Sequence, residues 1–221
     1  MAGFAVLVQP DSTAQARQYT FDTFLSLTAE LKHLDRPSGH AVGSHCTAAK
    51  FVSPPSQHRG IIRDEKTGSW ILATGTIVCL ADNSTAHPDL NSVLQGYLRR
   101  GIRSLDEYDG HFALVIYNGL SESLSVISDP IGLFSIYYGS HGKQTFVSTS
   151  VLAVAKQIGS KPDVLAIEHF LRIGEMDGRR TMWQDVKRLP PASILKITND
   201  SVETCEYWAP WVDEQVARLS F

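Results

Sequence analysis

Hydrophobic positions along the chain follow two patterns, short runs typical of β-strands and longer stretches with helical spacing. The clearest helix is expected after Pro88, where apolar residues fall on one face and two arginines and a glycine end the segment. These residues are Leu90, Val93, Leu94, Tyr97, Leu98, Arg99, Arg100 and Gly101. Further helices are expected over residues 21–31 and 162–171.

Strands are expected where β-branched and aromatic residues form short runs. These runs are residues 3–8, 69–79, 112–117, 124–128, 134–138, 144–148 and 193–198. The runs between residues 112 and 148 follow one another across short turns, which predicts an antiparallel meander. Residues 33–59, rich in His, Ser, Pro and Gly, predict loops around one short strand at Phe51-Val52. Helix and strand runs segregated in this way favour an α+β fold.

Composition narrows the class of protein. Of 221 residues, 43% are hydrophobic and 19% are charged, as in globular proteins, and the net charge of −3 offers no basic patch for nucleic acid. No apolar run reaches the roughly 20 residues of a membrane span, and no signal peptide is evident. The cysteines lack the spacing of a disulfide framework or zinc site and the histidines lack metal spacing, so we expect a cytoplasmic protein without metal or cofactor.

Several short motifs occur in a specific order in the second half of the chain. Residues 105–118 read LDEYDGHFALVIYN, residues 128–132 read SDPIG, and residues 136–139 read IYYG. Residues 147–150 read VSTS ahead of Leu152, and residues 187–192 read KRLPPA ahead of Tyr207-Trp208. In order and spacing these segments resemble the L…GxFAxxxxD, RDxxG…PLYY, ASExKAL and lpPG segments of the N-terminal glutaminase domain of asparagine synthetases. That family includes β-lactam synthetases and lasso-peptide cyclases, and the resemblance covers about residues 88–208.

The resemblance implies the N-terminal-nucleophile (Ntn) hydrolase fold, a four-layer αββα sandwich of two antiparallel sheets flanked by helices. It places this domain at residues 1–208 and leaves residues 209–221 as a tail where a synthetase domain would begin. In the family, a cysteine follows the removed initiator methionine, its thiolate attacks the glutamine amide, and its own α-amine accepts the proton. This sequence has Ala2 at that position, and a methyl group cannot attack a carbonyl.

Other positions of the implied glutamine pocket also depart from the family. Thr74-Gly75-Thr76 occupies the place of an Asn-Gly-Glu segment that binds the oxyanion and the substrate ammonium. The glycine is kept, but a threonine hydroxyl binds an ammonium more weakly than a carboxylate does. Lys50 falls near the arginine that holds the substrate carboxylate, and offers a point charge instead of a bidentate fork. Asp89 falls at the aspartate that would contact the substrate amine.

Structural roles are open for some of the same residues. Asp89 precedes a helix in the context Pro-Asp-Leu-Asn, which is typical of an N-cap. Lys50 is most simply a solvated surface charge. Asp129 with Gly132 is most simply a turn in which the carboxylate binds backbone amides and the glycine takes a positive φ.

These departures lead to one main hypothesis and two alternatives. The main hypothesis is a degenerate class II glutamine amidotransferase domain without glutaminase activity, which serves a separately supplied ATP-dependent amide-forming synthetase, as in amino-acid or peptide natural-product biosynthesis. The chain has no SGGxDS loop of the kind that holds the pyrophosphate of ATP. The first alternative is an active, glutamine-hydrolysing asparagine synthetase domain in which Ala2 replaces a natural cysteine. The second is a regulatory module that binds glutamine or another amino acid.

Overall fold

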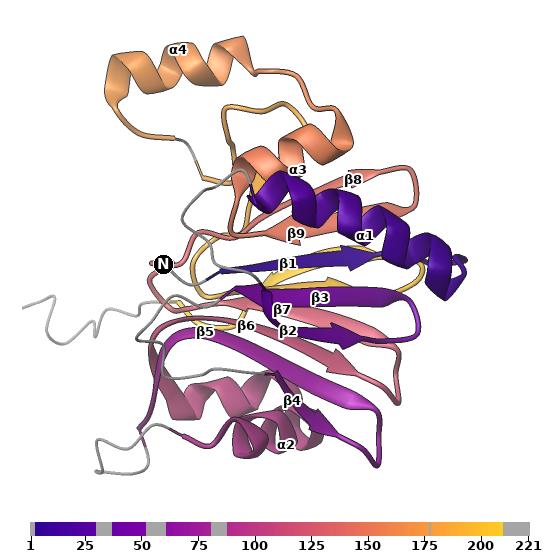
Figure 1. Cartoon of the computed structure of the whole chain (residues 1–221). Coiled ribbons are helices and arrows are strands. Elements are labelled where there is room, and N and C mark those ends of the chain that lie inside the picture. The colour runs from indigo at the N-terminus through magenta and orange to yellow at the C-terminus, as the bar shows by residue number, and fades with distance from the viewer. Residues whose placement is uncertain (1–2, 30–36, 52–60, 81–87, 177, 210–221) are drawn as a thin grey trace, which may run out of the picture.

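The architecture consists of two six-stranded antiparallel sheets stacked face to face, with helices on both outer sides (Figure 1). A computed structural model of the chain describes residues 3–29, 37–51, 61–80, 88–176 and 178–209. The first sheet has the order β10 (Lys187–Arg188), β8 (Tyr137–His141), β9 (Gln144–Ser148), β1 (Gly3–Val8), β3 (Cys46–Phe51) and β2 (Pro37–Val42). The second has the order β12 (Val202–Glu206), β11 (Ser193–Ile197), β7 (Ser123–Ser128), β6 (Tyr108–Asn118), β5 (Ser69–Cys79) and β4 (Ile61–Asp64).

Helices cover the outer face of each sheet. The helices α1 (Ala14–Ala29) and α3 (Val151–Ile158) pack on the first sheet, and α2 (Leu90–Arg100), continued by the 3₁₀-helix η1 (Gly101–Glu107), packs on the second. The helix α4 (Val164–Ile173) stands at the edge of the molecule beyond α3 (Figure 1). The expected α+β fold, a four-layer αββα sandwich, is therefore confirmed.

The central strands are buried on both faces, which explains their continuous apolar sequences. In β1, Phe4 and Val6 face the core between the sheets, whereas Ala5 and Leu7 face α1 and α3. The helices exclude water from the outer face of the sheet, so apolar residues are favoured on both faces of these strands. The core between the sheets contains side chains from both sheets, and Trp70 belongs to it.

The expected meander over residues 112–148 is wrong. The strands β6 and β7 form a hairpin in the second sheet, and β8 and β9 form another in the first, so the chain crosses between sheets in the segment that joins β7 to β8. The strand expected over residues 134–138 begins only at Tyr137, because Ile136 enters the core between the sheets and Asp129 organises the preceding turn. Hairpin signals are local and do not specify which sheet a hairpin joins.

Some other element predictions also differ from the structure. The first helix begins at Ala14, ahead of the expected residue 21, and its first turn has Thr13 Oγ1 accepting from the amide of Ala16 at 3.2 Å. Residues 33–59 contain the two strands β2 and β3 where one was expected, and Val52 lies outside the described residues. The elements α3, β2, β4 and β12 were not expected; each is short, at four to eight residues.

Candidate functional site

The strand β1 starts at one end of the space between the two sheets, and it lies at the centre of the first sheet. Gly3 pairs with Phe51 and Phe4 pairs with Lys50, so Lys50 lies beside the first residues of β1. Ala2, the position expected for the nucleophile, directly precedes this strand and lies outside the described residues. Lys50 is therefore a described residue of the implied glutamine pocket that lies near the expected position of the nucleophile.

Lys50 is buried, and the expectation of a solvated surface charge is wrong. Along β3 it shares a face with Cys46 and Ala48, which belong to the core between the sheets. Its side chain is 0% exposed, and Nζ has no hydrogen-bond partner among the described residues. Burial lowers the pKa of this amine to about 8, because the ammonium form loses its hydration.

Thr74 lies on the facing sheet with its hydroxyl in a similar situation. In β5 it shares a face with Trp70 and Leu72, both in the core between the sheets. Its exposed fraction is 0%, and Oγ1 has no hydrogen-bond partner among the described residues. A buried hydroxyl without a partner is uncommon and costs free energy, as does a buried amine without one.

The registers of the two sheets bring Lys50 and Thr74 to the same end of the sandwich. The backbone amide of Ser44, just before β3, donates to the Tyr117 hydroxyl of the other sheet at 3.1 Å. From this contact, β3 runs towards Lys50. In the other sheet, β6 leads in the same direction from Tyr117 back to Ala113, and Ala113 pairs with Thr74. Both unpaired groups thus lie on inner faces towards the end at which β1 begins.

Gly75 has a structural requirement for glycine. Its φ is +92°, and a Cβ atom would lie 2.1 Å from the carbonyl oxygen of His111 and 2.6 Å from the Phe134 ring. The His111 and Phe134 rings stack with centroids 6.1 Å apart and an interplanar angle of 5°. Thr76 pairs with His111 and is half-buried. Thr74-Gly75-Thr76 therefore lies on β5 with Phe134 packed against its glycine.

Asp129 fixes the turn that carries Phe134, as the sequence predicted. Its Oδ1 accepts from the backbone amides of Ile131 and Leu133, and its Oδ2 from that of Phe134, each at 3.1 Å. The carboxylate is fully buried, and Gly132 has a φ of +67° with Pro191 in close contact. The stacking of His111 on Phe134 was not predicted. This contact depends on the turn that places Phe134, and the pattern of hydrophobic residues does not indicate it.

Asp89 is the N-cap of α2, which confirms the structural interpretation. Its carboxylate accepts from the backbone amide of Asn91 at 3.2 Å, and the residue is exposed. The helix α2 packs on the outer face of the second sheet, whereas Thr74 faces inwards. Among the described contacts, none brings Asp89 to Lys50 or Thr74.

The described residues between the two sheets provide little for nucleophilic or metal chemistry. Burial raises the pKa of the Cys46 thiol to about 12, so this cysteine is protonated at neutral pH. Within the described ranges, no cluster of His, Cys, Asp and Glu side chains could hold a metal ion. No helix in the same part of the chain is long and apolar enough to cross a membrane. The distinctive chemistry here is one buried amine and one buried hydroxyl, neither with a hydrogen-bond partner in the described part of the chain.

Comparisons with known proteins agree with this architecture. The glutamine phosphoribosylpyrophosphate (PRPP) amidotransferase from B. subtilis, solved with ADP and GMP, matches with a TM-score of 0.54 and 12% identity over 94% of this chain and 50% of that chain. A structure described as the allosteric regulatory enzyme of purine biosynthesis matches with a TM-score of 0.55 and 12% identity over 95% of this chain and 50% of that chain. The chain therefore spans about half the length of these proteins, and at this identity the likeness shows the fold alone.

The sequence comparisons address the family. No curated protein sequence matches this chain. A family model described as a glutamine amidotransferase domain matches residues 80–208, which is more than half of the chain. With the Ntn-hydrolase sandwich observed here, the chain belongs to the family of glutamine amidotransferase domains.

Proposed function

We propose that this chain is a degenerate glutamine amidotransferase domain of the asparagine synthetase type, which does not hydrolyse glutamine and serves a separately supplied ATP-dependent, amide-forming synthetase. Ala2 is the observation that carries this proposal. Amide hydrolysis by this route needs a nucleophile beside the α-amine at the start of β1, and a methyl group supplies none. The domain keeps its core packing and its turns, so what has been lost is chemistry rather than fold.

The surroundings of Lys50 support the loss of glutamine binding. Glutamine is a zwitterion, so its pocket needs a cation for the carboxylate and an anion for the ammonium. The pKa of Lys50 is lowered by burial, and no carboxylate of the described residues opposes this effect. Thr76 stands where the resemblance expects the glutamate. An ammonium bound here would therefore lack a charged partner, which a hydroxyl replaces poorly.

The proposed domain comprises residues 1–208, with residues 209–221 as the segment where a synthetase domain would begin. The family match ends at Trp208, which supports this boundary. The 221 residues contain no SGGxDS segment, so we propose that the ATP-dependent step belongs to a synthetase domain outside them. Amide formation that does not consume ammonia, as in peptide natural-product biosynthesis, would be compatible with a silent glutaminase domain.

Ammonia release from glutamine tests this proposal directly. The purified chain and its Ala2→Cys variant are assayed in parallel, with mass spectrometry to confirm removal of Met1 and thermal unfolding to confirm folding. We expect neither protein to exceed the uncatalysed background. Ammonia release by the chain as given would refute the proposal. Activity of the Ala2→Cys variant alone would instead favour the active glutamine-hydrolysing domain in which Ala2 replaces a natural cysteine.

A second candidate function is ligand binding without catalysis, as in a regulatory module for an amino acid or related small molecule. The buried amine of Lys50 favours it, because this amine has no partner among the described residues and an anionic ligand group would satisfy it. Calorimetric titration with glutamine, glutamate and glutaramate, which is glutamine without its α-amine, tests this function. Heat with the unchanged chain and none with Lys50→Met would support it, and no heat with any of the three would exclude it for these ligands.

A further inference from the structure

A cavity of about 440 Å³ lies on the outer side of the first sheet, away from Lys50 and Thr74. It is open on one side and is lined by the start of α3, by α4 and by the segment that follows α4. Most of its lining is apolar, including Leu152, Ile167, Met176, Met182 and Trp183. Its volume falls within the range of small-molecule sites, roughly 300–1,000 Å³. The role proposed above for this domain does not use this cavity.

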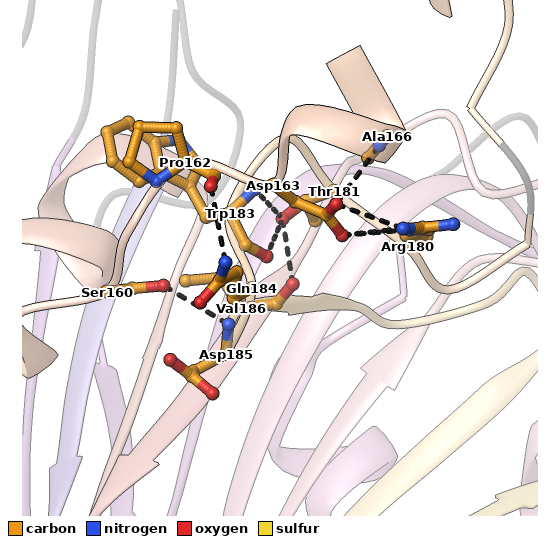
Figure 2. Close-up of polar contacts among 10 residues, drawn as sticks. All are labelled: Ser160, Pro162, Asp163, Ala166, Arg180, Thr181, Trp183, Gln184, Asp185 and Val186. Carbon is orange, nitrogen blue, oxygen red and sulfur yellow. Dashed lines mark hydrogen bonds and ion pairs between the residues drawn. The ribbon is translucent and has the colours of Figure 1, made fainter. Parts of the chain in front are cut away.

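The walls of the cavity are preformed by hydrogen bonds between two segments of the chain, as Figure 2 shows. The backbone amide of Asp163 donates to the carbonyl of Met182 at 2.8 Å, and Pro162 forms an isolated β-bridge with Trp183. The Thr181 hydroxyl is buried and donates to the carbonyl of Val186 at 2.8 Å. Backbone groups satisfied in this way hold the side chains that line the cavity in place.

Two guanidinium groups line the cavity, and their charges are in different situations. Arg180 forms a bidentate pair with Asp163, through Nε at 2.9 Å and Nη2 at 3.0 Å, and the same carboxylate caps α4 (Figure 2). The Arg188 guanidinium donates to the carbonyl of Gly132 at 3.3 Å and pairs with no carboxylate of the described chain. No acidic side chain is among the described residues of the lining. An apolar lining is therefore combined with the Arg188 guanidinium, which has no carboxylate partner among the described residues.

The helix α4 is held mainly at its ends, which leaves room between it and α3. Ala166 is its one buried residue, although the helix is rich in aliphatic side chains. Its N-terminus is capped by Asp163, and its C-terminus ends at Gly174 in a left-handed conformation. Ile167 faces the cavity from the middle of this helix. A ligand in the cavity would supply the apolar contact that the body of the domain does not give to Ile167.

We propose that this cavity is a binding site for an aliphatic carboxylate, such as a medium-chain fatty acid. Its chain would lie among Ile167, Met176, Met182 and Trp183, and its carboxylate would pair with Arg188. Methionine side chains adapt to flexible aliphatic chains, which suits a ligand of variable shape. The guanidinium fork matches a carboxylate in a bidentate manner, and the apolar surroundings strengthen this charge-assisted bond.

Titration of the full chain with decanoate, below its micelle concentration, tests the site. We expect saturable binding by calorimetry, with decanol, of equal chain length but uncharged, binding at least about tenfold more weakly. Amide shifts in a heteronuclear NMR titration should be confined to α4, the start of α3 and residues 180–188. An absence of decanoate binding, or equal binding of decanol and decanoate, would overturn the proposal.

Variants of the chain distinguish the contribution of the Arg188 charge to binding from that of the cavity volume. Arg188→Gln should weaken decanoate binding about tenfold and leave decanol binding unchanged, whereas Ile167→Trp should fill the cavity and abolish binding of both. Arg179→Gln is the matched control, because Arg179 is a neighbouring arginine outside this lining and should not affect either ligand. Thermal unfolding shows whether each variant is folded. Decanoate affinity that is unchanged in a folded Arg188→Gln protein would contradict the assignment of the carboxylate.

Discussion

Lys50 places an amine in the core between the two sheets, where it is fully buried and has no hydrogen-bond partner among the described residues. Burial lowers its pKa from an ordinary value of 10.5 to about 8. The folded protein therefore binds this proton less tightly than the unfolded chain does. By linkage, proton binding favours the unfolded chain over the folded protein at every pH where the unfolded chain binds the proton more tightly.

The pH dependence of stability follows from this difference. Below about pH 8 both states are protonated, so the folded state bears the full cost of the buried ammonium. Between about pH 8 and 10.5 the folded state loses the proton first, and the contribution of Lys50 to stability rises with pH. We expect Lys50→Met to be more stable than the unchanged chain by about 2 kcal/mol at pH 7, as measured by urea denaturation. This difference should decrease as the pH rises from about 8 to 10.5, because the folded state then buries a neutral amine.

Cys46 titrates in the same range with the opposite sign and must be controlled. Burial raises the pKa of its thiol to about 12, so its contribution to stability falls as the pH rises above the ordinary value of 9.0. Both proteins in the comparison keep Cys46, so the difference between them at each pH isolates Lys50. A stability difference that did not change between pH 7 and 10.5 would show that the effect comes from packing and not from charge.

Asp129 contributes to stability through three backbone amides. Asp129→Ala would leave the amides of Ile131, Leu133 and Phe134 without their acceptor in a buried turn. We expect this variant to lose about 3 kcal/mol of unfolding free energy in urea denaturation. Asp129→Asn keeps one acceptor oxygen and should lose less. Equal losses in the two variants would indicate that the negative charge, and not the number of acceptors, stabilises the turn.

At the scale of elements, boundaries marked by specific side chains were predictable. The strand β5 runs over residues 69–79 as expected, because Thr67-Gly68 marks the turn before it. The helix α2 is marked at its start by Asp89 and at its end by Gly101, whose amide binds the carbonyl of Tyr97. Short elements such as α3, with eight residues, present too few periods for recognition.

The candidate site was predictable only in part, for a related reason. The chain segment Thr74-Gly75-Thr76 was recognisable from its motif, and the structure gives the glycine a steric reason. The burial of Lys50 depends on pairing between β3 and β1, whose partners are distant in the sequence, as Phe4 is from Lys50, and local patterns do not report such pairing. The placement of Phe134 likewise depends on long-range structure, because Phe134 lies in the segment where the chain crosses from the second sheet to the first.

The cap of α2 gives a prediction at this scale. Asp89→Ala should lower the unfolding free energy by about 1 kcal/mol, because the first turn of α2 loses an acceptor for the amide of Asn91. Asp89→Ser preserves an acceptor and should restore most of this loss. Thermal or urea denaturation of the three proteins provides the measurement. A loss of stability in Asp89→Ser as large as that in Asp89→Ala would argue against capping.

At the scale of the whole molecule, the fold and the chemistry separate clearly. The core between the sheets is built from apolar side chains of both sheets, such as Phe4, Leu72 and Val126, and needs none of the catalytic groups that the family uses. Selection for packing can therefore preserve the sandwich after the nucleophile is lost. The two hairpins join different sheets and Asp129 holds the turn before β8, so the fold that the proposed pocket requires is present.

If this separation holds, chemistry should return when the missing groups are restored on the same fold. We expect a variant with Ala2→Cys, Lys50→Arg, Thr74→Asn and Thr76→Glu to release ammonia from glutamine above background, while Ala2→Cys alone stays silent. The threefold variant that keeps Ala2 is the control: it should bind glutamine by calorimetry and release no ammonia, because it has a charged partner for each end of the zwitterion and no nucleophile. Glutamine binding without turnover in the fourfold variant would locate the remaining defect in the position of the nucleophile. Absence of binding in both folded variants would contradict the assignment of Lys50, Thr74 and Thr76 to the former pocket.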